Sequence, residues 1–252
     1  MIPKVIHYCW FGGNPLPKSV ELCIDSWKKY CPDYEIKQWN ESNFDINYNA
    51  YVRDAYKAKK WAYVSDVARL KVVYDNGGIY LDTDVELIKP LDDLLDNLCY
   101  MGVESTGSIN SGLGFGSEAQ IPIIGELLND YETQKFDSSN MISCPVLTTD
   151  IMTKYGYVKS QDIQRIQGMT IYPVEYFSPI NSTTRKKYIT SNTYSIHWYD
   201  ASWQTEEYKK NTKIRVLCCT LLGERLGLRI HGHMTAIQQE GIKRYILRHL
   251  SR

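Results

Sequence analysis

Apolar and polar residues follow two different periods along the first half of the chain. Apolar side chains recur at helical spacing over 18–30 and 61–76, whereas 4–9, 34–39 and 99–103 are short, mostly apolar runs. Helical spacing is typical of an amphipathic helix, and short apolar runs between turn residues are typical of buried strands. This alternation predicts an α/β fold with a mostly parallel sheet, covered by helices on both faces, whose ligands bind where strands end.

The second half of the chain is less regular. The stretch 110–117 carries glycine at alternate positions, which predicts a strand that either approaches a ligand closely or packs tightly on a helix. Residues 134–193 are rich in turn residues. Further helices are predicted over 91–98, 120–133, 205–226 and 234–250. We therefore expect two parts, an α/β domain over 1–204 and a basic helical extension over 205–252.

Two aspartates stand directly after an apolar run. Asp82 and Asp84 follow Gly78-Ile79-Tyr80-Leu81, and residues two apart on an extended chain point to the same side. Two carboxylates on one side repel each other unless a cation lies between them. Mg²⁺ and Mn²⁺ prefer such oxygen ligands and commonly also bind substrate phosphates. An ordinary solvated turn is the alternative interpretation of the same pair.

The helix before this run supplies two further charges. Asp66 and Arg69 are three residues apart, so they share one helix face. The alternative is a surface ion pair, worth only about 0–1 kcal/mol. Asn76-Gly77-Gly78 is a strong helix stop that turns the chain directly into the strand. Helix and strand are thus expected to bring all four charged side chains to neighbouring places.

Three ordered motifs resemble one known family. The segment VSDVARLKVVYDNGGIYLDTDVEL at 64–87 is similar to the core of the sugar transferases of glycosyltransferase family 32. IPKVIHYCWFGG at 2–13 matches the first strand and nucleotide loop of that family, and HWYDASW at 197–203 resembles its C-terminal motif. The family includes yeast initiating mannosyltransferases and bacterial capsule and O-antigen enzymes, and clostridial glucosylating toxins share the pattern. The resemblance implies a GT-A fold and a metal-dependent hexosyltransferase.

The resemblance also implies a role for each charged residue. Asp84 would bind the cation, Mn²⁺ or Mg²⁺, with His197 completing its shell, and Asp82 would contact the donor and the cation's water shell. Arg69 and the cation would neutralise the leaving diphosphate, and Asp66 would bind sugar hydroxyls. Relatives retain the anomeric configuration, so an α-linked product is expected, with no carboxylate assigned as nucleophile. His197 as a buried histidine packed among aromatic side chains is the alternative.

The nucleotide-sugar donor is expected to lie against the first strand and the C-terminal motif. Trp10 follows that strand, and an indole there either stacks on a flat base or fills the core. The toxin relatives stack this tryptophan on uracil, so the resemblance favours a UDP-sugar. His7, inside the strand, is expected to be a hydrogen-bonded core histidine. Donor contacts are predicted for Trp10, Cys9, Tyr80, Asn110, Ser202 and Trp203.

Composition narrows the class of protein further. The 252 residues carry no net charge, with 29 basic and 29 acidic residues, which gives no sign of nucleic-acid binding. Seven cysteines without a C-x-x-C motif are expected to be reduced thiols. The N-terminus lacks a basic region followed by a long apolar run, and no segment approaches the length of a spanning helix. We expect a cytoplasmic enzyme.

The charge is distributed unevenly. Residues 207–252 carry 10 basic and 3 acidic residues, a net +7 that is balanced by −7 in the rest of the chain. Basic residues interleaved with apolar ones are typical of helices that lie on an anionic membrane surface, and a helical pair with solvated charges is the alternative. Peripheral contact with the inner face of a membrane would suit a lipid-linked acceptor, and a glycan is the other acceptor expected from the resemblance.

Two other classes of protein share parts of this pattern. Haloacid-dehalogenase-type phosphatases also place Asp-x-Asp after an apolar strand, but they need Thr or Val two residues after the second aspartate, where this chain has Glu86. A nucleotide-sugar-binding protein without activity is the other alternative. It is disfavoured because every residue type that the chemistry requires is present.

Overall fold

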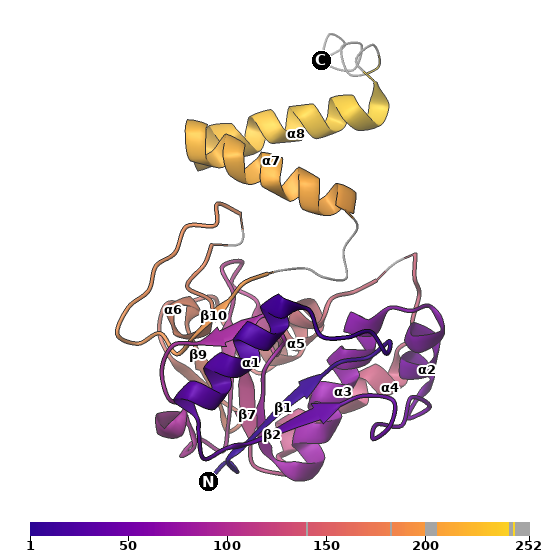
Figure 1. The fold of residues 1–252 in the computed structure, drawn as a ribbon, viewed down its shortest axis with the longest axis vertical. Coiled ribbons are helices and arrows are strands. Elements are labelled where there is room, and N and C mark those ends of the chain that lie inside the picture. The colour runs from indigo at the N-terminus through magenta and orange to yellow at the C-terminus, as the bar shows by residue number, and fades with distance from the viewer. Residues whose placement is uncertain (140, 182, 200–205, 242–243, 245–252) are drawn as a thin grey trace. The chain divides into compact units, whose positions relative to one another are not determined.

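The computed structural model describes residues 1–139, 141–181, 183–199, 206–241 and 244 (Figure 1). The chain divides into two compact units. The larger comprises Met1–Ile180 with Tyr188–Asp200, and the smaller comprises Asn181–Lys187 with Ala201–Arg252. The larger unit contains the predicted sheet, and the smaller contains two long helices of the C-terminal part.

The larger unit is built on an eight-stranded sheet in the order β2-β1-β3-β7-β5-β9-β8, with β6 paired to β5. Strands β1, β2, β3, β5 and β9 share one direction, and β6, β7 and β8 run against them. The predicted α/β fold with a largely parallel sheet is therefore confirmed. The strands are β1 Val5–Cys9, β2 Glu35–Trp39, β3 Gly78–Tyr80, β5 Cys99–Val103, β6 Ile109–Asn110, β7 Phe115–Ser117, β8 Gln164–Ile166 and β9 Met169–Tyr172.

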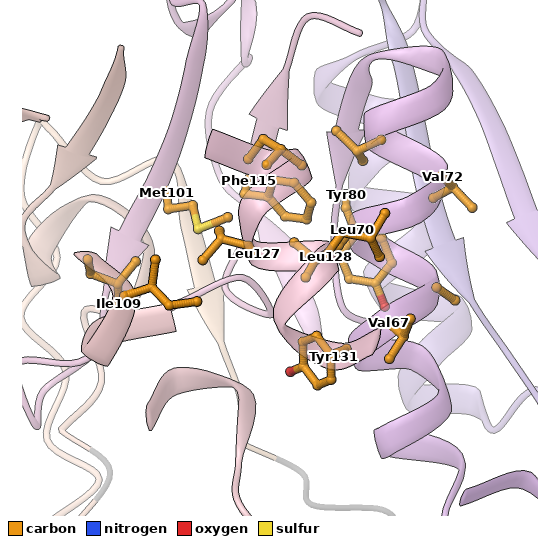
Figure 2. Close-up of a cluster of buried hydrophobic side chains, with 14 of the residues drawn as sticks. Val67, Leu70, Val72, Tyr80, Met101, Ile109, Phe115, Leu127, Leu128 and Tyr131 are labelled. Carbon is orange, nitrogen blue, oxygen red and sulfur yellow. The ribbon is translucent and has the colours of Figure 1, made fainter. Parts of the chain in front are cut away.

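Helices cover both faces of this sheet (Figure 1). Alternate side chains of strand β5 point to opposite faces of the sheet. Cys99 and Met101 belong to one apolar cluster, and Tyr100 belongs to the other. The first cluster lies under α3 and α4 (Figure 2), and the second lies under α1. The helices of this unit are α1 Lys18–Tyr30, α2 Ala50–Lys57, α3 Trp61–Asn76, α4 Pro122–Thr133, α5 Cys144–Lys154 and α6 Val174–Phe177.

Two consecutive glycines join α3 to β3. The amide of Gly77 donates to the carbonyl of Val73 at 2.8 Å and closes the helix, at a φ of +66°. Gly78 has a φ of +101°, and a Cβ there would lie 2.8 Å from the carbonyl oxygen of Val5. Because glycine alone accepts these conformations without strain, this pair fixes how α3 delivers its charged residues beside the end of β3.

Several sequence expectations were wrong in detail. The expected strand over 110–117 is divided into β6 and β7 by a connection at 111–114, and the expected helix over 91–98 is a single 3₁₀ turn, Asp92–Leu94. For the turn-rich stretch 134–193 the sequence analysis predicted no elements, and the structure has α5, β8, β9 and α6 there.

The smaller unit contains two packed helices, α7 Glu206–Leu222 and α8 Glu224–Glu240. The sequence placed the second helix about ten residues too late, and the end of that expected helix lies outside the described residues. Gly223, with a φ of +77°, separates the two helices. In the described part of the chain, no helix is both long and apolar enough to span a membrane.

Candidate functional site

Asp82 and Asp84 lie in the turn between β3 and β4 Val85–Leu87. The amide of Val85 donates to the carbonyl of Asp82 at 3.0 Å, which closes the turn. The sequence placed both aspartates on one face of a strand end, and this detail was wrong because the chain turns at Asp82. The turn nevertheless directs both carboxylates to the same place, where each is partly buried.

A two-stranded ladder brings His197 to the same point. Strand β10 Ser195–His197 pairs antiparallel with β4, so His197 lies opposite Val85, and the amide of Trp198 donates to the carbonyl of Asp84 at 2.9 Å. The Nε2 atom of His197 lies 3.1 Å from Oδ1 of Asp84. Burial opposes a charge on this imidazole, but the neighbouring carboxylates of Asp84 and Asp82 outweigh it and raise the pKa of His197.

These three side chains form a donor set that fits a divalent cation. One oxygen each from Asp82 and Asp84 and one nitrogen of His197 lie within 4.8 Å of one another. Two carboxylates and an imidazole suit Mn²⁺, and the two carboxylates also suit Mg²⁺. The other nitrogen of His197, Nδ1, is buried and has no hydrogen-bond partner among the described residues, so Nε2 is the nitrogen that faces the carboxylates.

Arg69 joins the helix to this site. Its Nη2 atom lies 2.9 Å from Oδ1 of Asp66 and 3.2 Å from Oδ1 of Asp82, and the side chains of Arg69 and Asp66 are only 5% and 10% exposed. Burial raises the pKa of Asp66 to about 6, although Arg69 acts in the opposite direction. Burial also raises the pKa of Asp82, again against the effect of Arg69. The alternative of an exposed surface pair is therefore wrong for Asp66 and Arg69.

Tyr80 and Cys9, two of the predicted donor contacts, are almost completely buried. The hydroxyl of Tyr80 donates to Oδ1 of Asp82 at 2.9 Å, and the guanidinium of Arg69 lies over the Tyr80 ring, 5.0 Å from its centroid. Burial raises the pKa of the Cys9 thiol to about 12. Tyr80 thus supports Asp82 and Arg69 from inside the protein.

Trp10 and His7 differ in their surroundings. Trp10 follows β1 and is half-buried, with its indole nitrogen donating to the carbonyl of Asn14 at 2.7 Å. His7 is buried, and its Nδ1 accepts from the indole of Trp39 at 3.0 Å while its Nε2 lies 2.9 Å from the carbonyl of Gly77. Burial lowers the pKa of His7 to about 4. His7 is therefore the hydrogen-bonded core histidine that the sequence predicted.

Asn110 makes its hydrogen bonds within the protein. Its Oδ1 accepts from the amide of Gly112 at 2.7 Å, and its Nδ2 donates to Oε2 of Glu104 at 3.1 Å. The two predicted donor contacts in the C-terminal motif, Ser202 and Trp203, lie outside the described residues.

The structure places four further residues next to the site, Ser111, Gly112, Cys144 and Tyr199, and to none of them did the sequence interpretation assign a role in the site. Nη1 of Arg69 lies 3.5 Å from Oγ of Ser111 and 3.7 Å from Sγ of Cys144, and Gly112 faces Asp82. The ring of Tyr199 packs on His197 with 4.2 Å between centroids. The alternating glycines pointed to a close approach near 112, but local spacing contains no signal for Cys144 or Tyr199.

This chain is similar to known sugar transferases. Residues 17–101 match the family described as "Glycosyltransferase sugar-binding region containing DXD motif". An uncharacterised glycosyltransferase of Acanthamoeba polyphaga mimivirus is 25% identical over 218 residues, which cover 81% of this chain and 84% of the viral protein. Inositol phosphoceramide mannosyltransferase 3 of Schizosaccharomyces pombe is 32% identical over 130 residues, or 45% of this chain and 33% of the yeast protein.

One solved structure supports the fold. The PaToxG glycosyltransferase aligns with a TM-score of 0.50 at 20% identity, over 61% of this chain and 69% of that one. These comparisons confirm the resemblance to sugar transferases of the family 32 type, the GT-A fold and the enzyme class expected from the sequence.

Proposed function

We propose that this glycosyltransferase moves a hexose from a nucleotide-diphosphate sugar, with a UDP-sugar favoured, to a glycan or a lipid-linked acceptor. The observation that carries the proposal is the convergence of Asp82, Asp84 and His197 on one point, beside a buried arginine. A diphosphate is a poor leaving group until its negative charge is neutralised. A cluster that can hold a divalent cation is therefore the feature that this chemistry most needs.

In this proposal Asp82, Asp84 and His197 hold Mn²⁺ or Mg²⁺, and the bound cation supplies positive charge to the departing diphosphate. Arg69 contributes to the site by holding the carboxylates of Asp66 and Asp82 in position. Its guanidinium is almost fully buried between Asp66 and Asp82, so it stabilises the position of Asp82 and adds positive charge beneath the site. Oδ1 of Asp66 already accepts from Arg69. In this proposal Asp66 therefore binds a donor hydroxyl through its second carboxylate oxygen.

In this proposal the base of the nucleotide lies at the end of β1. Trp10 stands at the carboxyl end of that strand, half-buried, with its indole nitrogen held by the carbonyl of Asn14. An indole that is held in place and only half-buried suits stacking on uracil. The resemblance to family 32 implies an α-linked product, and the proposal assigns no protein nucleophile.

The function is tested by incubating the purified full-length protein with a panel of UDP-sugars and other nucleotide sugars, with Mn²⁺ or with excess chelator. We expect Mn²⁺-dependent release of the nucleotide diphosphate from at least one donor, and loss of this release in Asp84→Asn. Asp96→Asn is the matched control, because Asp96 is an exposed aspartate away from the turn. Release of inorganic phosphate would instead indicate a phosphatase, and no turnover of any donor would indicate a binding protein.

For the acceptor we propose a lipid-linked glycan at the cytoplasmic face of a membrane, as in capsule, O-antigen or lipopolysaccharide synthesis. The name of the fission yeast relative includes a phosphosphingolipid acceptor, which supports a lipid class. Helices α7 and α8 expose both apolar and basic side chains. The exposed apolar ones include Leu217, Leu221, Leu222, Leu226, Leu228 and Met234, and the exposed basic ones include Lys210, Lys213, Arg225 and Arg229.

Sedimentation with anionic and with neutral vesicles tests this peripheral contact. Each basic residue near an anionic surface contributes roughly 1 kcal/mol, so binding should be salt-sensitive and should weaken in the variant Lys210→Glu/Lys213→Glu. The matched control is Lys57→Glu/Lys59→Glu, which makes the same charge change on exposed residues of the larger unit. Equal recovery of the wild type in the supernatant with both kinds of vesicle would contradict membrane contact.

A further inference from the structure

Gly112 lies against the carboxylate of Asp82, in the connection between β6 and β7. A Cβ atom at this position would lie 2.2 Å from Oδ2 of Asp82, 3.0 Å from Nη1 of Arg69 and 3.1 Å from Oδ1 of Asn110. Gly112 does not have a positive φ, so its backbone alone does not require glycine. We propose that Gly112 is a positioning residue for Asp82, an inference that rests on the proposed role of Asp82 as a cation ligand.

Asp82 has little freedom to move away from Gly112. Its Oδ1 is held by Nη2 of Arg69 at 3.2 Å and by the hydroxyl of Tyr80 at 2.9 Å, and both of these partners are buried. The amide of Asp82 also donates to the carbonyl of Gly112 at 3.3 Å. The carboxylate therefore lies between a buried hydrogen-bonding pair and the backbone of residue 112. Any atom added at that position must displace it.

A chain of hydrogen bonds in turn fixes Gly112. Its amide donates to Oδ1 of Asn110 at 2.7 Å, and Nδ2 of Asn110 donates to Oε2 of Glu104 at 3.1 Å. Glu104 directly follows β5, so the support begins on a central strand of the sheet. Gly112 is thus held at a defined distance from Asp82 by the sheet itself.

A methyl group at position 112 should therefore change the geometry of the donor set. Asp82 must rotate away from Arg69 and Tyr80, or the connection must shift and lose the bond to Asn110. Residues that orient a ligand without binding the metal typically change metal affinity by about 10- to 100-fold when they are mutated. We expect a loss of Mn²⁺ affinity in this range for Gly112→Ala, with turnover partly restored at high Mn²⁺ concentration.

The experiment compares full-length wild type, Gly112→Ala, Asp82→Ala and the double variant. Mn²⁺ binding is measured by titration calorimetry, and stability is measured by thermal unfolding without added metal. Gly232→Ala is the matched control for the loss of a glycine, since a Cβ there would meet nothing within 4 Å. We expect Gly112→Ala to lower the unfolding midpoint of the wild type and to have much less effect when Asp82 is already alanine.

Two results would overturn the inference. One is wild-type Mn²⁺ affinity in a folded Gly112→Ala protein, and the other is an equal loss of stability in the presence and absence of the Asp82 carboxylate. If Gly112→Ala does not yield folded protein, Asn110→Ala releases the same connection and should weaken Mn²⁺ binding in the same direction. If the wild type itself binds no Mn²⁺, the proposed function fails, while the unfolding cycle still measures the contact between residues 112 and 82.

Discussion

Replacing Arg69 with methionine should destabilise the protein far more than removing an ordinary ion pair. Arg69 is the shared partner of Asp66 and Asp82, at 2.9 and 3.2 Å, and its side chain is 5% exposed. A methionine side chain keeps much of the volume of the arginine side chain, but it leaves the carboxylates of Asp66 and Asp82 without the guanidinium that pairs with them. Breaking a buried ion pair by removing one partner typically costs about 3–5 kcal/mol, because the remaining charge stays buried. We expect a loss in that range near neutral pH.

A matched control lies two residues along the same helix. Lys71 forms a partly exposed pair with Asp75, and such pairs contribute only about 0–1 kcal/mol. Lys71→Met should therefore change the free energy of unfolding by less than about 1 kcal/mol. Urea denaturation of the wild type, Arg69→Met and Lys71→Met measures the free energy of unfolding of each protein. The slopes of the three transitions are compared as well.

The pH dependence tests the cause of the loss. Burial already raises the pKa of Asp66 to about 6, and Arg69 acts against that rise. Without Arg69 this pKa should rise further, so the folded variant binds more protons than the unfolded chain over the weakly acidic range. Stability of the variant relative to the wild type should then recover as the pH falls from about 8 to about 5. Equal losses for Arg69→Met and Lys71→Met, or a loss that is independent of pH, would refute this reasoning.

Three other changes have defined outcomes. Trp10→Ala should weaken UDP binding by about 1–3 kcal/mol in calorimetry if the indole stacks on the base, and unchanged affinity would assign the indole to packing alone. Burial lowers the pKa of His7 to about 4. The unfolded chain therefore binds the proton more readily, and stability should fall by up to about 3 kcal/mol as the pH drops from about 6.5 to about 4. Urea denaturation of His7→Gln at several pH values should show no such dependence of stability on pH. If this variant loses as much stability as the wild type, His7 is not the group responsible. His197→Ala should lower Mn²⁺ affinity by at least about tenfold while the fold is kept, and wild-type affinity would exclude the imidazole as a ligand.

Local spacing was sufficient to predict which charged side chains meet at the end of β3. Asp66 and Arg69 share a helix face, and the two glycines after α3 turn the chain so sharply that Asp82 arrives beside them. These contacts depend on a helix, a turn and a strand that are consecutive in the sequence. The position of His197 required the family resemblance, because it reaches Asp84 only through the pairing of β10 with β4.

Contacts between distant segments could not be predicted in the same way. Alternating glycines at 112, 114 and 116 imitate the period of a strand, but Gly114 has a φ of +124°, which no regular strand contains. The close approach of Gly112 to Asp82 is visible only when β7 is placed beside β3.

The two C-terminal helices illustrate a different error. Gly227 lies within α8, although the sequence analysis ended one helix at 226 and began the next at 234. A Cβ at Gly227 would lie 2.5 Å from the backbone of Cys219, so this glycine permits close packing of α7 and α8.

The central claim is that Asp82, Asp84 and His197 hold one divalent cation next to the donor diphosphate. Anomalous diffraction from crystals grown with Mn²⁺ and UDP tests this claim most directly. The account predicts one strong manganese peak within bonding distance of Asp84 and of Nε2 of His197, with Asp82 bound directly or through a water and the UDP phosphates completing the shell. A peak elsewhere, or UDP bound at this turn without any metal, would contradict it.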